Sequence, residues 1–228
     1  MGLFPSRKPD SGWGSGGGGH CYLEGTLIAT PDGERCIESL AIGDLVTTAS
    51  GAARPVKWIG RWTAEQGWDW QYVPVKVSRG ALDGTAPHTD LYVSDQHCMF
   101  IDGVLIPAID LVNGISITKE APSAIDALRY FHVELEEHDI IVANGAQSES
   151  LRVAAGDRQR FENGEEYLGL YDYEPVNMAA CAPIIGNTTR MKELQSRFRT
   201  AIAPLYDVRH PHEVVRARLA DQATRLAA

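Results

Sequence analysis

The sequence lacks any run of about 20 apolar residues, which excludes a membrane-spanning helix of ordinary length. It is also short of positive charge: 21 Lys and Arg stand against 30 Asp and Glu, giving a formal net charge of -9. Proteins that bind nucleic acid through its phosphates need clustered basic residues, so we expect no nucleic-acid partner. The N-terminal residues contain no apolar signal-peptide core, which favours a cytoplasmic over a secreted location.

Cysteine is scarce and irregularly spaced. The four cysteines, Cys21, Cys36, Cys98 and Cys181, form no C-x-x-C pair, which argues against a zinc ribbon. We therefore expect no metal and no other cofactor. An even number of cysteines permits two disulfides, but a chain of 228 residues does not need them, so free thiols are the simpler expectation.

The remaining composition is ordinary for a globular protein, with 44% hydrophobic and 22% charged residues. Residues 1–20 are rich in glycine and are expected to form a flexible leader. Residues 21–150 contain many short apolar segments between turn residues, which is typical of a mainly β, barrel- or disk-like body. Residues 151–228 are expected to form a partly helical C-terminal extension that packs on this body.

The expected strands cover residues 26–30, 45–48, 56–62, 72–77, 91–94, 99–101, 104–106, 115–118, 130–135 and 140–142. Pro31-Asp32-Gly33 and Asn144-Gly145 mark turns between strands. In the extension, Thr188-Thr189 is expected to begin one helix. A second helix is expected over 212–227, with Val215, Leu219, Ala223 and Leu226 facing inward.

Cys21 directly follows the glycine run GSGGGGH and begins an apolar segment. A cysteine that attacks the peptide bond on its own N-terminal side must reach back to the carbonyl of residue 20. Glycine lets the preceding chain bend, because it has no Cβ to clash. His20-Cys21 is therefore the predicted cleavage junction.

The segment CYLEGTLIATPDGERCIESLAIGDLVTT resembles the opening of Hint domains, the module shared by Hedgehog autoprocessing domains and inteins. The resemblance rests on Cys21, the Gly25-Thr26 strand start, the Pro31-Asp32-Gly33 turn, and Leu40 and Gly43-Asp44 before Val46. It implies a horseshoe or disk of short twisted strands.

The same resemblance points to a second site segment. Breaking an amide with a thiol requires a proton donor for the departing nitrogen, usually a histidine. Ser94-Asp95-Gln96-His97 resembles the T-x-x-H motif of Hint domains, with serine in place of threonine. The resemblance implies that His97 activates the scissile amide and that Ser94 helps to hold it. His132 and His138 lie in the segment that resembles the closing strands, and both are further candidates.

The sequence also departs from both named groups. A splicing intein closes on His-Asn, whereas the corresponding positions here are Glu149-Ser150, so full splicing is not expected. Hedgehog domains carry a general-base aspartate where this chain has Gly60, so sterol transfer is not supported. The closest likeness is to a bacterial autoprocessing subgroup, through His132, His138-Asp139, Glu149-Ser150 and Cys181-Ala182-Pro183.

The main hypothesis is self-cleavage by an N-to-S acyl shift at His20-Cys21, in which the protein's own N-terminal segment is the substrate. Water or another small nucleophile would then resolve the thioester. Two alternatives stay open: a Hint-fold binding or structural module with little activity, and a cysteine hydrolase that acts on other molecules through Cys21 and His97.

Overall fold

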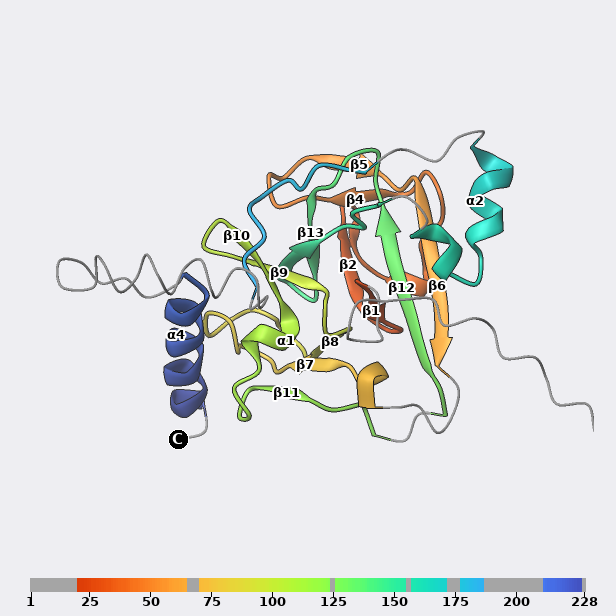
Figure 1. Ribbon diagram of the computed structural model, residues 1–228. Coiled ribbons are helices and arrows are strands. Elements are labelled where there is room, and N and C mark those ends of the chain that lie inside the picture. The colour runs from red at the N-terminus through yellow and green to blue at the C-terminus, as the bar shows by residue number, and fades with distance from the viewer. Residues whose placement is uncertain are drawn as a thin grey trace, which may run out of the picture.

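The computed structural model describes residues 20–64, 70–123, 126–154, 157–171, 177–186 and 211–226. Two six-stranded sheets and a small two-stranded sheet make up its body (Figure 1). The first sheet has the order β11 (Ile117–Lys119), β7 (Val75–Val77), β8 (Leu91–Val93), β1 (Tyr22–Leu23), β12 (Leu128–Glu134) and β6 (Trp58–Ala64). The second has the order β10 (Val104–Pro107), β9 (Cys98–Ile101), β14 (Ala146–Glu149), β13 (Ile140–Ala143), β2 (Leu27–Thr30) and β3 (Gly33–Cys36).

The smaller elements lie around these sheets. A hairpin of β4 (Leu45–Thr47) and β5 (Ala53–Pro55) forms the third sheet. The helices are α1 (Ala108–Leu111), α2 (Gly164–Leu170) and α4 (Pro211–Leu226), with short 3-10 turns η1 (Ile37–Ser39), η2 (Trp70–Tyr72) and η3 (Arg158–Arg160). The strand pairs are antiparallel, which confirms the predicted mainly β fold with a C-terminal helix. Among the described helices, none has the length and apolar character needed to cross a bilayer.

Every predicted strand has a counterpart, and no end shifts by more than three residues. Four strands were not predicted: β1, β3, β5 and β14. They are two to four residues long, and β3 (GERC) and β5 (ARP) are largely exposed, so they lack the apolar alternation that reveals a half-buried strand. The predicted Asn144-Gly145 turn joins β13 to β14, with φ angles of 48° and 78°.

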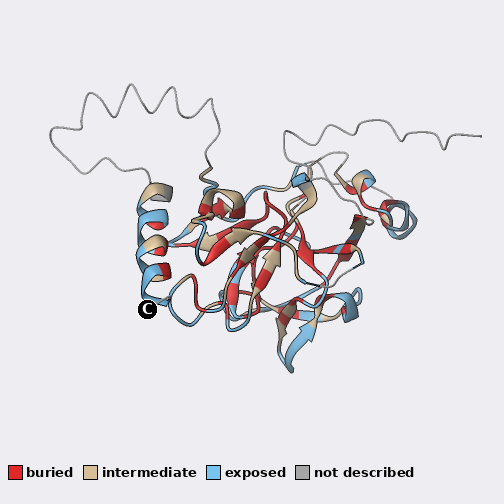
Figure 2. Cartoon of the chain, turned by 90° about the horizontal axis from the view of Figure 1, so that it is seen from below, coloured by how far each residue is buried: buried red, intermediate tan, exposed pale blue. Residues whose placement is uncertain are grey.

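The described residues after β14, 151–154 and 157–171, pack against the first sheet. Leu151, Val153, Phe161 and Tyr167 share a buried cluster with Cys21 and with strand residues of the first sheet. Figure 2 shows the buried residues gathered in the central strands. Arg158 forms a buried two-point ion pair with Glu134 of β12, at 2.6 and 3.0 Å.

The outer edge of β6 is covered by the same extension. The Arg61 N–H donates to Asn163 Oδ1 at 2.9 Å, and Asn163 Nδ2 donates to the Ile59 carbonyl at 2.9 Å. The Glu162 N–H donates to the Arg61 carbonyl at 2.8 Å. These bonds occupy backbone groups that an edge strand would otherwise leave open to another chain.

The end of the chain is described only over 177–186 and α4. In the first segment, the Ile185 N–H donates to the Leu105 carbonyl at 2.8 Å, so this stretch runs beside β10. Helix α4 packs near α1 and buries Val215, Leu219 and Ala223 as predicted (Figure 1). The prediction for Leu226 was wrong: it is 48% exposed, because it lies in the last turn of the helix. The helix expected after Thr188-Thr189 lies outside the described residues.

Candidate functional site

Cys21 lies immediately before β1, and Ser94 immediately follows β8, the strand that pairs with β1. The Cys21 N–H donates to Ser94 Oγ at 2.8 Å, and the Ser94 N–H donates to the Cys21 carbonyl at 2.8 Å. The Ser94 hydroxyl thus accepts from the nitrogen of the His20-Cys21 amide itself. The Ser94 carbonyl also accepts from the His97 N–H at 3.1 Å.

His97 lies in the turn between β8 and β9 and is fully buried. Its ring packs against the Tyr22 ring at a centroid distance of 4.2 Å and against the His132 ring at 5.1 Å. Burial lowers the pKa of His97 to about 4, so the imidazole is neutral near pH 7. The His20 backbone carbonyl lies near enough to raise this pKa slightly, although neither ring nitrogen makes a hydrogen bond of normal geometry to a described residue.

His132 reaches the site from β12. In the β1–β12 ladder, Tyr22 pairs with Phe131 and Leu23 with Tyr130, so one further step of this register places Cys21 opposite His132. Directly opposed residues in an antiparallel pair have Cβ atoms about 4.5–5.5 Å apart. Burial, reinforced by nearby His97, holds the pKa of His132 well below its usual value.

The Cys21 thiol is buried in the cluster that also contains Leu23, Trp58 and Tyr130. Burial, followed by the negative charge of Glu149, raises the pKa of this thiol. Any attack by Cys21 therefore begins from the protonated thiol, and a base must remove the proton as the sulfur reacts.

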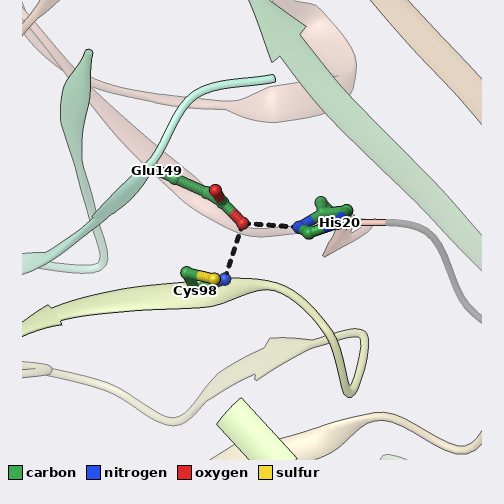
Figure 3. Close-up of side chains that lie close together, drawn as sticks. All are labelled: His20, Cys98 and Glu149. Atoms are coloured by element: carbon green, nitrogen blue, oxygen red, sulfur yellow. Dashed lines mark hydrogen bonds and ion pairs between the residues drawn. The ribbon is translucent and has the colours of Figure 1, made fainter. Parts of the chain in front are cut away.

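Glu149 is a further residue of the site, which the sequence indicated only as part of the Glu149-Ser150 pair. Its side chain is fully buried at the end of β14, and Figure 3 shows it between His20 and Cys98. Glu149 Oε1 accepts from His20 Nδ1 at 2.7 Å and from the Cys98 N–H at 2.7 Å. The available signal was its position, since Glu149-Ser150 stands where a splicing intein has its closing residues.

His138 joins the site through Glu149. Its Nδ1 accepts from the Cys181 N–H at 3.0 Å, so in the neutral ring Nε2 carries the proton. Nε2 lies 3.4 Å from Glu149 Oε2. Burial would raise the pKa of Glu149, but the charge of His20, the proximity of His138 and the hydrogen bond from His20 hold it well below its usual range.

All of the residues predicted for the site therefore gather around the junction. His20, Ser94 and His132 lie on or near the Cys21 backbone, His97 packs against His132, and His138 contacts the carboxylate that holds His20. The four cysteines are free, and Cys181 is exposed.

One group of donors has the chemistry of a cation site. His20 Nδ1, Cys98 Sγ and a carboxylate oxygen of Glu149 lie within 4.8 Å of one another. The His20–Glu149 ion pair and the Cys98 N–H bond already satisfy the carboxylate oxygen without a metal. We assign no metal ligands here.

Comparison with known proteins supports the likeness seen in the motifs. A family model described as a Hint domain matches residues 20–155, which is more than half of the chain. Among solved structures, the MchDnaB-1 intein has a TM-score of 0.40 at 15% identity, over 56% of this chain and 98% of that one. A bacterial intein-like domain from Clostridium thermocellum has a TM-score of 0.42 at 14% identity, over 58% and 98%.

A DnaB intein from Synechocystis sp. PCC 6803 has a TM-score of 0.38 at 11% identity, over 57% of this chain and 99% of that one. The search of curated proteins gives no match. These structural likenesses are distant, and it is the family model that decides membership. The chain belongs to the Hint domain family.

Proposed function

We propose that the chain cleaves itself between His20 and Cys21 by an N-to-S acyl shift. The Hint fold supports a self-processing domain in general terms. The observation that carries the finer proposal is the 2.8 Å bond from the Cys21 amide N–H to Ser94 Oγ, in a site where the buried His97 ring lies 4.2 Å from the ring of Tyr22, the residue that follows Cys21. Cleavage of a peptide bond requires a group that can pass a proton to the departing nitrogen, and a nearby imidazole is suited to this role.

In the proposed first step, Cys21 Sγ attacks the carbonyl carbon of His20. The S–C bond forms, the C–N bond breaks, and the thiol proton must reach the departing nitrogen of Cys21. His97 is suited to this transfer because its lowered pKa leaves a neutral ring that can accept a proton and pass it on. Ser94 holds the amide in place during the transfer.

The other two histidines act on this step through their neighbours. His132 packs against the His97 ring and lies opposite Cys21, and it therefore fixes the ring that moves the proton. His138 contacts Glu149, which binds the side chain of His20. Both are positioning residues in this proposal.

In the second step, water or another small nucleophile attacks the thioester carbonyl. The leader leaves with the His20 carboxylate, and the Cys21 thiol is restored with a free amine. The chain has Glu149-Ser150 in place of a closing His-Asn, so no residue there can cyclise in the manner of a splicing intein.

Intact-mass measurement tests the proposal. With dithiothreitol or hydroxylamine, the full-length chain is expected to yield a fragment that ends at His20 and a fragment that begins at Cys21. Cys21→Ala should stay whole, whereas Cys36→Ala, which removes a free thiol from the edge strand β3, should cleave at the normal rate. Equal cleavage of the wild type and Cys21→Ala would overturn the proposal.

A Hint-fold binding module is the second candidate, because the Cys21 thiol is buried and its pKa is raised. This candidate predicts that prolonged incubation with thiol leaves only intact chain. The 2% exposure of Cys21 disfavours the third possibility, hydrolysis of outside substrates, because such substrates need access to the nucleophile.

A further inference from the structure

The peptide bond between His20 and Cys21 is held from both of its sides. On the amine side, Ser94 Oγ binds the Cys21 N–H at 2.8 Å. On the acyl side, Glu149 Oε1 binds the His20 side chain at 2.7 Å (Figure 3). The first contact is made to a backbone N–H, so it does not depend on the residue at position 20. The second contact is made to the side chain at position 20, so it does depend on that residue.

Burial of the Glu149 carboxylate is energetically unfavourable without a partner of opposite charge. Its side chain has no exposed surface, and moving a carboxylate out of water is unfavourable unless it is paired and hydrogen-bonded. Its hydrogen-bond donor within the body is the Cys98 N–H at 2.7 Å, and His138 Nε2 lies 3.4 Å away without a hydrogen bond to it. Its shortest side-chain contact comes from His20, on the segment that the proposed reaction removes.

The His20 ring is suited to be this partner. Its side chain is 33% exposed, so the ring reaches the carboxylate from the solvent side. Burial opposes its protonation, but the Glu149 charge and hydrogen bond outweigh burial, and the pKa of His20 is raised. Arg152 opposes protonation of the ring, Asp157 favours it, and Asp95 also interacts with the His20 charge.

We propose that Glu149 determines specificity in this domain by selecting a basic side chain, here the His20 imidazole, at the position before the cleaved bond. The proposal rests on self-cleavage at His20-Cys21. The ion pair fixes the His20 side chain, and thereby limits how the adjoining carbonyl lies beside His97 and Cys21. The accepted acyl donors are thus peptide segments that end in histidine or another basic residue.

The test compares cleavage rates of full-length variants in dithiothreitol. His20→Gln and His20→Ala are expected to slow cleavage about 10- to 100-fold, because a hydrogen bond to a charged group is lost. His20→Asp should be slower still, and His20→Arg should keep more activity than His20→Ala. In a Glu149→Gln background, His20 should lose its advantage over His20→Gln. Equal rates for all residues at position 20 would overturn the inference while leaving self-cleavage intact.

His88 provides the matched control. It pairs with Glu34 at 2.7 Å, the same distance as the His20–Glu149 pair, but on an exposed surface. His88→Gln should leave the cleavage rate within about twofold of the wild type. A loss as large as that of His20→Gln would attribute the effect to general destabilisation and contradict the inference.

A second measurement does not depend on cleavage. In a Cys21→Ala chain, an NMR titration should give His20 a pKa above the value found when Glu149→Gln is added. Similar His20 pKa values in both chains would contradict the inference. If the two differ but the wild type never cleaves, self-cleavage fails and the proposed selectivity fails with it.

Discussion

The Cys21 backbone N–H and the Ser94 hydroxyl oxygen, 73 residues apart in the sequence, lie 2.8 Å from one another in a buried hydrogen bond. The contact follows from the antiparallel pairing of β1 with β8, in which Tyr22 lies opposite Val93. Cys21, just before Tyr22, therefore lies beside Ser94, just after Val93. The amide proposed to break is therefore held at the ends of two paired strands.

The first prediction concerns this bond. Ser94→Ala is expected to slow thiol-induced cleavage about tenfold, because a buried N–H left without a partner costs about 1–3 kcal/mol and the amide loses its fixed orientation. Ser94→Thr keeps the hydroxyl and should retain most of the activity. Intact-mass time courses measure both, and an equal loss in Ser94→Thr would show that packing rather than the hydroxyl is responsible.

The second prediction is the pH dependence of stability due to His97. In the folded chain burial lowers its pKa to about 4, whereas the unfolded chain has a value near about 6.5. Between these values the unfolded state binds more protons, so stability falls as the pH falls through this window. The expected loss is about 1.4 kcal/mol per pH unit for one such group.

Urea denaturation of a Cys21→Ala chain between pH 7 and pH 5 measures this slope. This slope reports how many protons the chain takes up on unfolding, and His97→Gln should lower that number by about one. His132, whose pKa is also lowered by burial, should account for part of the proton uptake that remains. An unchanged slope in His97→Gln would show that His97 is not held neutral.

Much of the site was predictable because it is encoded locally. Cys21 after a glycine run and the Ser94-to-His97 segment are short motifs, and the mainly β body follows from short apolar segments between turns. The turn at Asn144-Gly145 was also predictable, since both residues tolerate the positive φ angles found there.

The role of Glu149 was not predictable in the same way. It follows from β14 lying beside β9, which brings Glu149 to the Cys98 N–H, and from the path of the chain at His20. The buried pair of Arg158 and Glu134 was likewise hidden, because the two charged residues lie in different elements. Such pairings depend on the tertiary fold and leave no local pattern.

The third prediction tests whether this extension is part of the folding unit. Arg158→Ala should destabilise the chain by about 3–5 kcal/mol, because it leaves Glu134 as an unpaired buried charge. Burial raises the pKa of Glu134 even with Arg158 present, so the pair itself contributes little net stability. Arg158→Met combined with Glu134→Leu should therefore recover most of the loss in chemical denaturation. A negligible effect of Arg158→Ala would mean that residues 151–171 fold independently of β12.

The fourth prediction concerns Gly60, which stands where Hedgehog domains have an aspartate. Gly60 pairs with His132 across β6 and β12, and a Cβ built on it would lie 2.6 Å from the Phe161 ring. Such an approach is closer than van der Waals contact permits, so Gly60→Ala should destabilise the fold by about 1–3 kcal/mol as the ring is displaced. Gly60→Asp should cost more, because it also buries a carboxylate.

Combining Gly60→Ala with Phe161→Ala separates two effects of Gly60→Ala: the clash with the Phe161 ring and the loss of backbone freedom. Phe161→Ala alone creates a cavity and should be destabilising by about 3–5 kcal/mol. When Phe161→Ala is combined with Gly60→Ala, the ring that the new methyl group would contact is absent. The double variant should therefore lose less free energy of unfolding than the sum of the two single variants. Thermal and urea denaturation of the four chains give this coupling. If the destabilisation of the double variant equals the sum of the two single effects, the Phe161 ring moves away from β6 without cost. Phe161 would then not prevent an aspartate from fitting at position 60 beside His132.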